Sequence, residues 1–143
     1  FSKAQQLAKK YESLIISDEV QTGIGRLGTL FGYQTTDLKP DIMAIAKGLG
    51  GGVPIGAVLA TKKVASAMKP GSHGSTFGGN PLAMAAGNAV LDIIFEKGFL
   101  KNVKEKGKYF DGGLNRIKDK YPKIIGEIRG VGLIKGLKML VDK

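Results

Sequence analysis

Two short apolar runs, each ending in a charged residue, constrain the fold of this chain most strongly. The run Leu14-Ile15-Ile16 is followed by Ser17 and Asp18, and the run from Ile42 to Ala46 is followed directly by Lys47. Short apolar runs of this kind indicate buried strands. Because open α/β sheets place their ligands at the carboxyl ends of their strands, the acid and the lysine are predicted to emerge where a ligand binds.

A glycine-rich connection, residues 21–40, separates the two predicted strands. A structureless loop of this length inside a compact domain is usually functional. It carries a Gly-x-Gly-x-x-Gly pattern at Gly23, Gly25 and Gly28. A dinucleotide-binding fingerprint opens a helix directly after a strand, whereas this pattern lies several residues past the strand and no helical stripe follows it. The sequence therefore gives little support to a nicotinamide cofactor.

An acid and a lysine at strand ends suit pyridoxal phosphate chemistry. A lysine amine condenses with the cofactor aldehyde, and a carboxylate on the pyridine nitrogen keeps the ring protonated, so that it accepts electrons from the substrate. A lysine that leaves a buried strand is expected to be partly desolvated, which lowers its pKa and favours the nucleophilic amine. The alternative is that Lys47 is a solvated surface residue and Asp18 a turn or capping residue.

Several longer motifs match one enzyme family. They are Asp18-Glu19-Val20-Gln21-Thr22-Gly23, Gly25-Arg26, Ala46-Lys47-Gly48 and the run His73 to Leu82, HGSTFGGNPL. Together they resemble the class III pyridoxal-phosphate-dependent aminotransferases and, within that class, most of all the acetylornithine aminotransferases. The resemblance extends from about residue 1 to residue 140. Leu27 departs from it, since the family usually reads Gly-Arg-Thr-Gly at this place.

The resemblance assigns roles to the residues around the two strand ends. It implies that Lys47 is the catalytic lysine bonded to pyridoxal 5'-phosphate, and that Asp18 pairs with the ring nitrogen. Val20 is expected to pack under the ring and Gln21 to reach the side of its phenolic oxygen. Glu19 is expected to have a structural role.

The resemblance also implies a cofactor phosphate site and a homodimer. Thr76 and Ser75 lie in a glycine-bracketed loop before a predicted helix, where hydroxyls and backbone amides bind phosphate. Without the resemblance this loop would be an ordinary polar turn. With it, Thr76 is expected to reach the cofactor phosphate of the partner subunit. Arg129 is interpreted as structural, because the arginine that binds the substrate carboxylate in this family lies further towards the C-terminus.

The predicted fold class is α/β. Residues 1–96 are expected to be part of the large domain of a fold-type I pyridoxal-phosphate transferase, and residues 97–143 the start of its small α+β C-terminal domain. The predicted strands span 14–17, 41–46 and 56–60, with two more in 123–140 joined at 130–132. The predicted helices span 2–11, 61–68, 81–97 and 100–118, with Thr61 and Asn80 as N-caps. Leu82, Ala86, Ala89 and Ile93 form the predicted apolar stripe of the third helix.

Composition narrows the function further. The 143 residues contain no cysteine and one histidine, which argues against thiolate catalysis and against a metal site. The net charge is +10, and residues 97–143 hold 13 basic and 5 acidic residues. We interpret this excess as a solvated helix face rather than a nucleic-acid surface. With no apolar run long enough to span a membrane, a cytoplasmic location is expected.

The sequence thus predicts transfer of an amino group from an acetylornithine-like donor to 2-oxoglutarate, in arginine biosynthesis. Ornithine, 4-aminobutyrate or succinyl-diaminopimelate are alternative donors. The family's main phosphate loop and carboxylate-binding arginine are expected to lie outside these residues, so the chain alone is predicted to be inactive. From another class of protein, a basic nucleotide- or nucleic-acid-binding α/β module remains the alternative.

Overall fold

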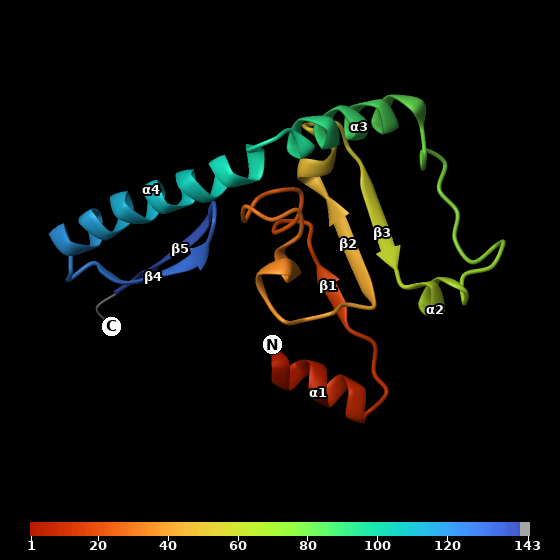
Figure 1. Cartoon of the computed structure of the whole chain (residues 1–143), viewed down its shortest axis with the longest axis horizontal. Coiled ribbons are helices and arrows are strands. Elements are labelled where there is room, and N and C mark those ends of the chain that lie inside the picture. The colour runs from red at the N-terminus through yellow and green to blue at the C-terminus, as the bar shows by residue number, and fades with distance from the viewer. Residues whose placement is uncertain (141–143) are drawn as a thin grey trace.

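The computed structural model describes residues 1–140. Residues 141–143, the end of the predicted small domain 97–143, lie outside the described residues. Figure 1 shows the elements in chain order. They are α1 (Ser2–Lys10), β1 (Ile16–Asp18), η1 (Gly32–Thr35), β2 (Ile42–Ala46), η2 (Lys47–Gly50), β3 (Gly56–Ala60), α2 (Lys62–Ala65), α3 (Pro81–Phe95), α4 (Phe99–Lys120), β4 (Ile125–Val131) and β5 (Ile134–Met139). The elements η1 and η2 are short 3-10 helices.

The first three strands form one sheet in the order β1-β2-β3. Strands β1 and β2 are parallel, with Asp18 beside Ala44, and β3 returns antiparallel to β2. One face of the sheet carries the core, where Met43 and Ile45 of β2 are buried together with Leu49 of η2. Because side chains alternate along a strand, Asp18 and Ala44 belong to the opposite face.

That opposite face is uncovered in this structure. Ile16 of β1 is 66% exposed and Val58 of β3 is 72% exposed. All five residues of β3 are exposed. The buried-strand prediction therefore holds for one face of β2 only, because no described segment packs over the other face of the sheet.

Helix α3 lies across the carboxyl end of β2 and contacts η2 (Figure 1). It begins as predicted, with Pro81 in the first turn and the side chain of Asn80 accepting a hydrogen bond from the amide of Ala83 at 2.9 Å. The face it buries differs from the predicted stripe.

The buried residues of α3 are Ala83, Gly87 and Ile94, whereas Leu82 and Ile93 are exposed. A Cβ on Gly87 would lie 3.6 Å from the carbonyl oxygen of Leu49. Helix α3 therefore packs on η2 through Gly87, at a distance where a Cβ would make ordinary van der Waals contact.

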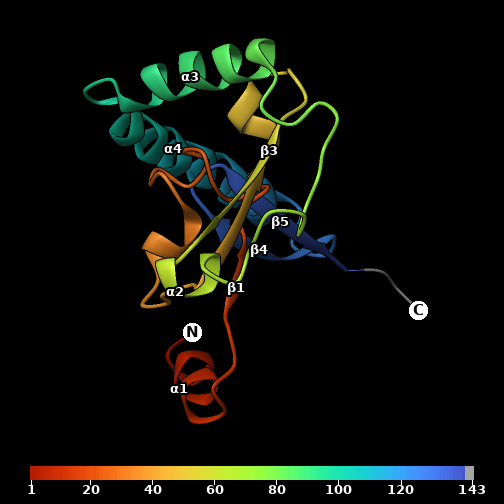
Figure 2. The ribbon, with the colours of Figure 1, turned by 90° about the vertical axis from the view of Figure 1, so that its right-hand side faces the viewer.

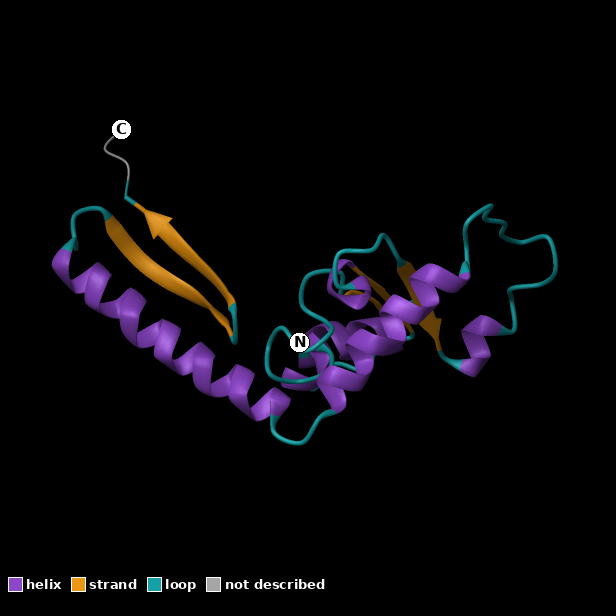
Figure 3. Ribbon diagram, turned by 90° about the horizontal axis from the view of Figure 1, so that it is seen from above, coloured by secondary structure: helices purple, strands orange, loops and turns teal. Residues whose placement is uncertain are grey.

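Helix α4 and the hairpin β4–β5 form a second unit. Figure 3 shows the hairpin lying along the helix. Val103, Gly107 and Leu114 of α4 are buried. The ammonium of Lys135 on β5, whose side chain is 4% exposed, forms an ion pair with Asp111 of α4 at 2.5 Å. The pair attaches the hairpin to the helix.

The second unit is joined to the loop that follows β1. The amide of Leu133 donates to the carbonyl of Arg26 at 3.1 Å. A Cβ on Gly132 would lie 2.5 Å from the Cα of Leu27 and a Cβ on Gly107 3.0 Å from the carbonyl oxygen of Gly132. Three backbone segments are therefore stacked in close contact. The division into domains 1–96 and 97–143 stays a prediction.

Most predicted elements are present, and α1 projects from the rest of the molecule (Figure 2). Strand β3 has the predicted bounds, while α2 is shorter than the predicted helix 61–68. Thr61 occupies the N-cap of α2, but its side chain makes no capping hydrogen bond. Among the described residues, no helix has the length and apolar character needed to cross a membrane.

Candidate active site

Asp18 and Lys47 emerge at the same edge of the sheet. Asp18 ends β1, Lys47 follows β2, and the two strands are parallel neighbours. The register places Asp18 beside Ala44, three residues before Lys47. The strand order and register therefore place both residues at the carboxyl edge of the sheet, as predicted.

Lys47 is exposed, contrary to the expectation that the strand would partly desolvate it. The reason is that Lys47 lies past the end of β2 and no described segment covers it. Its backbone φ is 47°, in the left-handed region that residues with a Cβ rarely adopt. Non-glycine residues in this region cluster at functional sites, where the surrounding structure holds them.

A second left-handed residue lies against the lysine turn. Ile24 has a φ of 55°, and a Cβ on Gly48 would lie 3.6 Å from the Cβ of Ile24. Ile24 also packs on the core cluster formed by Met43, Ile45 and Leu49. The loop after β1 is thus fitted closely beneath the turn that carries Lys47.

The Asp18 carboxylate is exposed, and one of its oxygens accepts a hydrogen bond from the amide of Val20 at 3.0 Å. This bond fixes the turn that leads from Asp18 to Gln21. Val20 is half-buried and Gln21 is exposed. Within residues 1–140, neither Asp18 nor Lys47 forms an ion pair, so both charged groups are available to a ligand.

The loop of residues 21–40 is ordered rather than structureless. No helix follows its glycine pattern directly, and the chain runs through turns before η1. Gly25 and Gly28 have φ values of 83° and 82° and lie against α4, where a Cβ on Gly25 would be 3.3 Å from the side chain of Leu100. The glycine pattern therefore allows the loop to pack against α4. This packing explains the glycines without a bound nucleotide.

Ser75 and Thr76 lie in the extended loop between α2 and α3, which Figure 1 shows projecting beside the sheet. Both are exposed. Ser75 lines a hollow of about 330 Å³ that extends to Gly56, and Gly56 pairs with Ala46 next to Lys47. Thr76 does not line this hollow. This hollow thus connects Ser75 with the lysine edge of the sheet.

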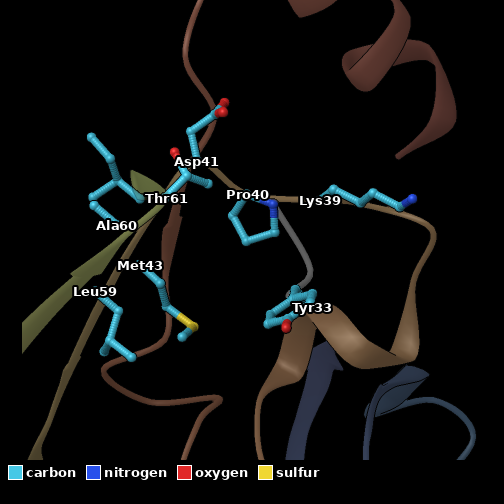
Figure 4. Close-up of a pocket in the computed structure, with 9 residues that line it drawn as sticks. Tyr33, Lys39, Pro40, Asp41, Met43, Leu59, Ala60 and Thr61 are labelled. Carbon is cyan, nitrogen blue, oxygen red and sulfur yellow. The ribbon is translucent and has the colours of Figure 1, made fainter. Parts of the chain in front are cut away.

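Another hollow, of about 320 Å³, lies at the other end of β2 (Figure 4). Its walls include the side chains of Tyr33, Met43 and Leu59. Asp41 also lines it, but the carboxylate accepts a hydrogen bond from the amide of Ile15 at 2.9 Å. Because the residues sit where β2 begins, this hollow is remote from Lys47.

The residues at the lysine edge fit pyridoxal phosphate. An amine and a carboxylate are both exposed there, and the small residues Ala44, Ala46 and Gly56 lie on the same sheet face as Asp18. Small side chains leave room for a flat aromatic ring over the sheet. The carboxylate could pair with the protonated ring nitrogen, and the lysine, as the neutral amine, could condense with the cofactor aldehyde.

An acid and a lysine at the carboxyl ends of neighbouring strands of an α/β sheet are the arrangement that the resemblance to pyridoxal-phosphate aminotransferases implies. The chain belongs to the class-III aminotransferase family, whose model matches residues 1–143. It is 54% identical over 137 residues to the acetylornithine aminotransferase of Agrobacterium fabrum, a match covering 96% of this chain and 34% of that protein. The acetylornithine aminotransferase of Aquifex aeolicus is 52% identical, with 96% and 35% covered. The chain therefore spans about a third of the length of the curated relatives it matches.

Solved transaminase structures share the fold. An S-selective transaminase from Arthrobacter sp. with alanine bound superposes with a TM-score of 0.89 at 36% identity, over 96% of this chain and 30% of that one. Ornithine aminotransferase from Plasmodium yoelii superposes with a TM-score of 0.84 at 39% identity, over 94% of this chain and 36% of that one. A third match is taurine:2-oxoglutarate aminotransferase from Bifidobacterium kashiwanohense, in complex with pyridoxal phosphate and glutamate. It superposes with a TM-score of 0.87 at 34% identity, over 95% of this chain and 31% of that one. The predicted fold class, an α/β part of a pyridoxal-phosphate transferase, is confirmed.

Sequence reasoning identified the two strand ends but missed the residues that support them. The sequence does not single out Ile24, and it indicates only a general structural role for Glu19. The glycines near Glu19 were the available signal, because a Cβ on Gly32 would lie 2.8 Å from a carboxylate oxygen of Glu19.

Proposed function

We propose that this chain is the cofactor-lysine segment of an aminotransferase and that Lys47 bonds covalently to pyridoxal phosphate. The observation that carries the proposal is the placement of Asp18 and Lys47 at one edge of two neighbouring parallel strands. When bound, the cofactor supplies an electron sink that stabilises negative charge on the substrate carbon bearing the amine.

Each residue at the edge has a defined task in this proposal. The Asp18 carboxylate would hold the proton on the ring nitrogen, and the Lys47 amine, once the substrate amine has replaced it, would move a proton between the substrate carbon and C4′ of the cofactor. Val20 would lie under the ring and Gln21 beside the phenolic oxygen. Their position in the turn fixed by Asp18 supports this assignment.

We propose that the enzyme is a homodimer in which Thr76 binds the cofactor phosphate of the partner subunit. The exposure of Thr76 in a projecting loop supports a contact outside its own chain. Ser75 would assist at the phosphate, since it lines the hollow that extends to Gly56. A hydroxyl and backbone amides in a glycine-rich loop are suitable phosphate ligands.

For the substrates we propose an acetylornithine-like amino donor and 2-oxoglutarate as acceptor, in cytoplasmic arginine biosynthesis. The names of the relatives from Agrobacterium fabrum and Aquifex aeolicus support the donor. A structural relative named for 2-oxoglutarate supports the acceptor. Ornithine is the alternative donor that a structural relative's name supports, and 4-aminobutyrate and succinyl-diaminopimelate are further alternatives.

The test is a chimaera in which this chain replaces the matching 137 residues of the Agrobacterium fabrum enzyme. We expect a yellow protein that transfers amino groups from acetylornithine. Reduction with borohydride should leave the cofactor covalently attached to Lys47. Lys47→Ala should abolish both the covalent label and turnover, and the control Lys62→Ala, which changes an exposed lysine of α2, should change neither. A folded chimaera without colour, or an active Lys47→Ala variant, would contradict the proposal.

A further inference from the structure

Glu19 is the most completely buried large side chain among the described residues, with 1% of its surface exposed. Its carboxylate accepts four hydrogen bonds. The donors are the amide of Gly32 at 2.7 Å, the amide of Tyr33 at 2.7 Å, the hydroxyl of Ser17 at 3.3 Å and the hydroxyl of Thr22. A buried carboxylate needs partners of this kind, because desolvation of an unpaired charge is costly.

The surrounding backbone is shaped to admit this carboxylate. A Cβ on Gly32 would lie 2.8 Å from an oxygen of Glu19 and 2.8 Å from the Cβ of Thr22. A Cβ on Gly23 would lie 2.8 Å from the carbonyl oxygen of Glu19. Glycine at both positions leaves the space that the side chain occupies, and the four donors around that space require an acceptor there.

Glu19 also lies at the junction of the segments that carry the candidate catalytic groups. Its amide donates to the carbonyl of Ala44 at 2.9 Å, which ties it to β2 three residues before Lys47. The residue before it is Asp18, and the hydroxyl of Thr22, just after Gln21, donates to its carboxylate. The side chain then reaches η1, on the far side of the loop.

We propose that Glu19 is a positioning residue that fixes the Asp18 carboxylate and the turn to Gln21 relative to Lys47. It does so as a carboxylate, the acceptor for four donors, so that an amide of the same shape cannot replace it. Glu19 is buried on the core side while Asp18 is exposed on the other face, so Glu19 acts through the backbone and does not touch the cofactor. The inference rests on the proposed function only for the tasks of Asp18 and Lys47.

The test uses the 143-residue chain without cofactor and the variant Glu19→Gln. The amide group of glutamine turns a donor towards at least one of the present donors. We expect hydrogen exchange to become about tenfold to a hundredfold faster at whichever of the Gly32 and Tyr33 amides faces the new NH2 group, as for a lost hydrogen bond to a charged group. Circular dichroism establishes that the variant is folded.

A second measurement separates positioning from general support. In the parent chain, the NMR shift of the Val20 amide should follow the acid titration of Asp18, whose carboxylate it contacts. In Glu19→Gln this response should be lost, because the turn no longer holds the amide against the carboxylate. The matched control is Glu105→Gln, an exposed glutamate on α4 that pairs with Lys101, and it should leave the response unchanged.

If Glu19→Gln does not fold, the variant Thr22→Val tests the proposal in its place. It removes one donor to Glu19, and we expect exchange at Gly32 to become about threefold faster or more, with a reduced response at Val20. A folded Glu19→Gln or Thr22→Val chain with the parent's exchange rates and the parent's Val20 response would overturn the proposal. Since neither measurement uses pyridoxal phosphate, this outcome is distinct from a failure of the proposed function.

Discussion

Gly132 is the residue at which the hairpin touches the loop beside the candidate site. Its φ is 55°, and a Cβ there would lie 2.5 Å from the Cα of Leu27, which is backbone and cannot rotate away. We expect Gly132→Ala to lower the free energy of unfolding by at least about 1–3 kcal/mol, the cost of left-handed strain alone.

The matched control is Gly136→Ala on β5, where an added Cβ meets no atom within 4 Å. Urea unfolding of both variants measures the difference. Equal stability of the two variants would show that the hairpin does not press on the loop at Gly132.

A pH-dependent contact lies on the same hairpin, between Arg129 and Glu127 at 2.5 Å. The hydrogen bond from Arg129 holds the pKa of Glu127 below its ordinary value. The stabilisation is therefore present above the ordinary glutamate pKa and is lost as the pH falls through the lowered pKa. We expect Arg129→Gln to raise the pKa of Glu127 towards the ordinary value in a carboxyl NMR titration, and Arg116→Gln on α4 to leave it unchanged.

At the scale of elements, the two predicted N-caps differ in a testable way. The Asn80 side chain accepts from the amide of Ala83, whereas the Thr61 side chain makes no capping hydrogen bond. Asn80→Ala is expected to cost about 0.5–2 kcal/mol of unfolding free energy, the usual loss for a working cap. Thr61→Ala is expected to cost clearly less, and the same unfolding assay checks both. A larger loss for Thr61→Ala would contradict the assignment.

The elements were predictable where a local signal determined them. Asn80 followed by Pro81 marks a helix start whatever the surroundings, and the run Gly56–Ala60 is bounded by turn residues. The buried face of α3 was not predictable, because it depends on the approach of η2 to Gly87 rather than on the apolar stripe. Tertiary contact overrides periodicity in such a helix.

The candidate site was also predictable only where a local signal in the sequence determined it. Strand ends that carry Asp18 and Lys47 are visible in the sequence, and parallel pairing brings them to one edge. The exposure of Lys47 and the left-handed backbone of Lys47 and Ile24 depend on what covers the sheet and on loop packing. The four donors to Glu19 come from β1, from Thr22 and from η1, which lies more than ten residues further along the chain, so no local pattern reveals them.

At the scale of the whole molecule, the uncovered sheet face is the dominant surface feature. Ile16 and Val58 expose most of their apolar surface on that face, and the outer edges of β1 and β3 pair with no other described strand. Exposed apolar faces and strand edges favour association. We therefore expect the isolated chain to self-associate reversibly, with a mass that rises with concentration in sedimentation velocity experiments.

Val58→Lys should weaken this association by about tenfold or more, because burying an unpaired ammonium group costs several kcal/mol and 1.4 kcal/mol already corresponds to tenfold. Met68→Lys is the matched control, since Met68 is comparably exposed but lies outside the sheet, after α2. It should leave the association unchanged. A monomeric parent chain at all concentrations, or equal weakening by both substitutions, would show that the chain does not associate through this face.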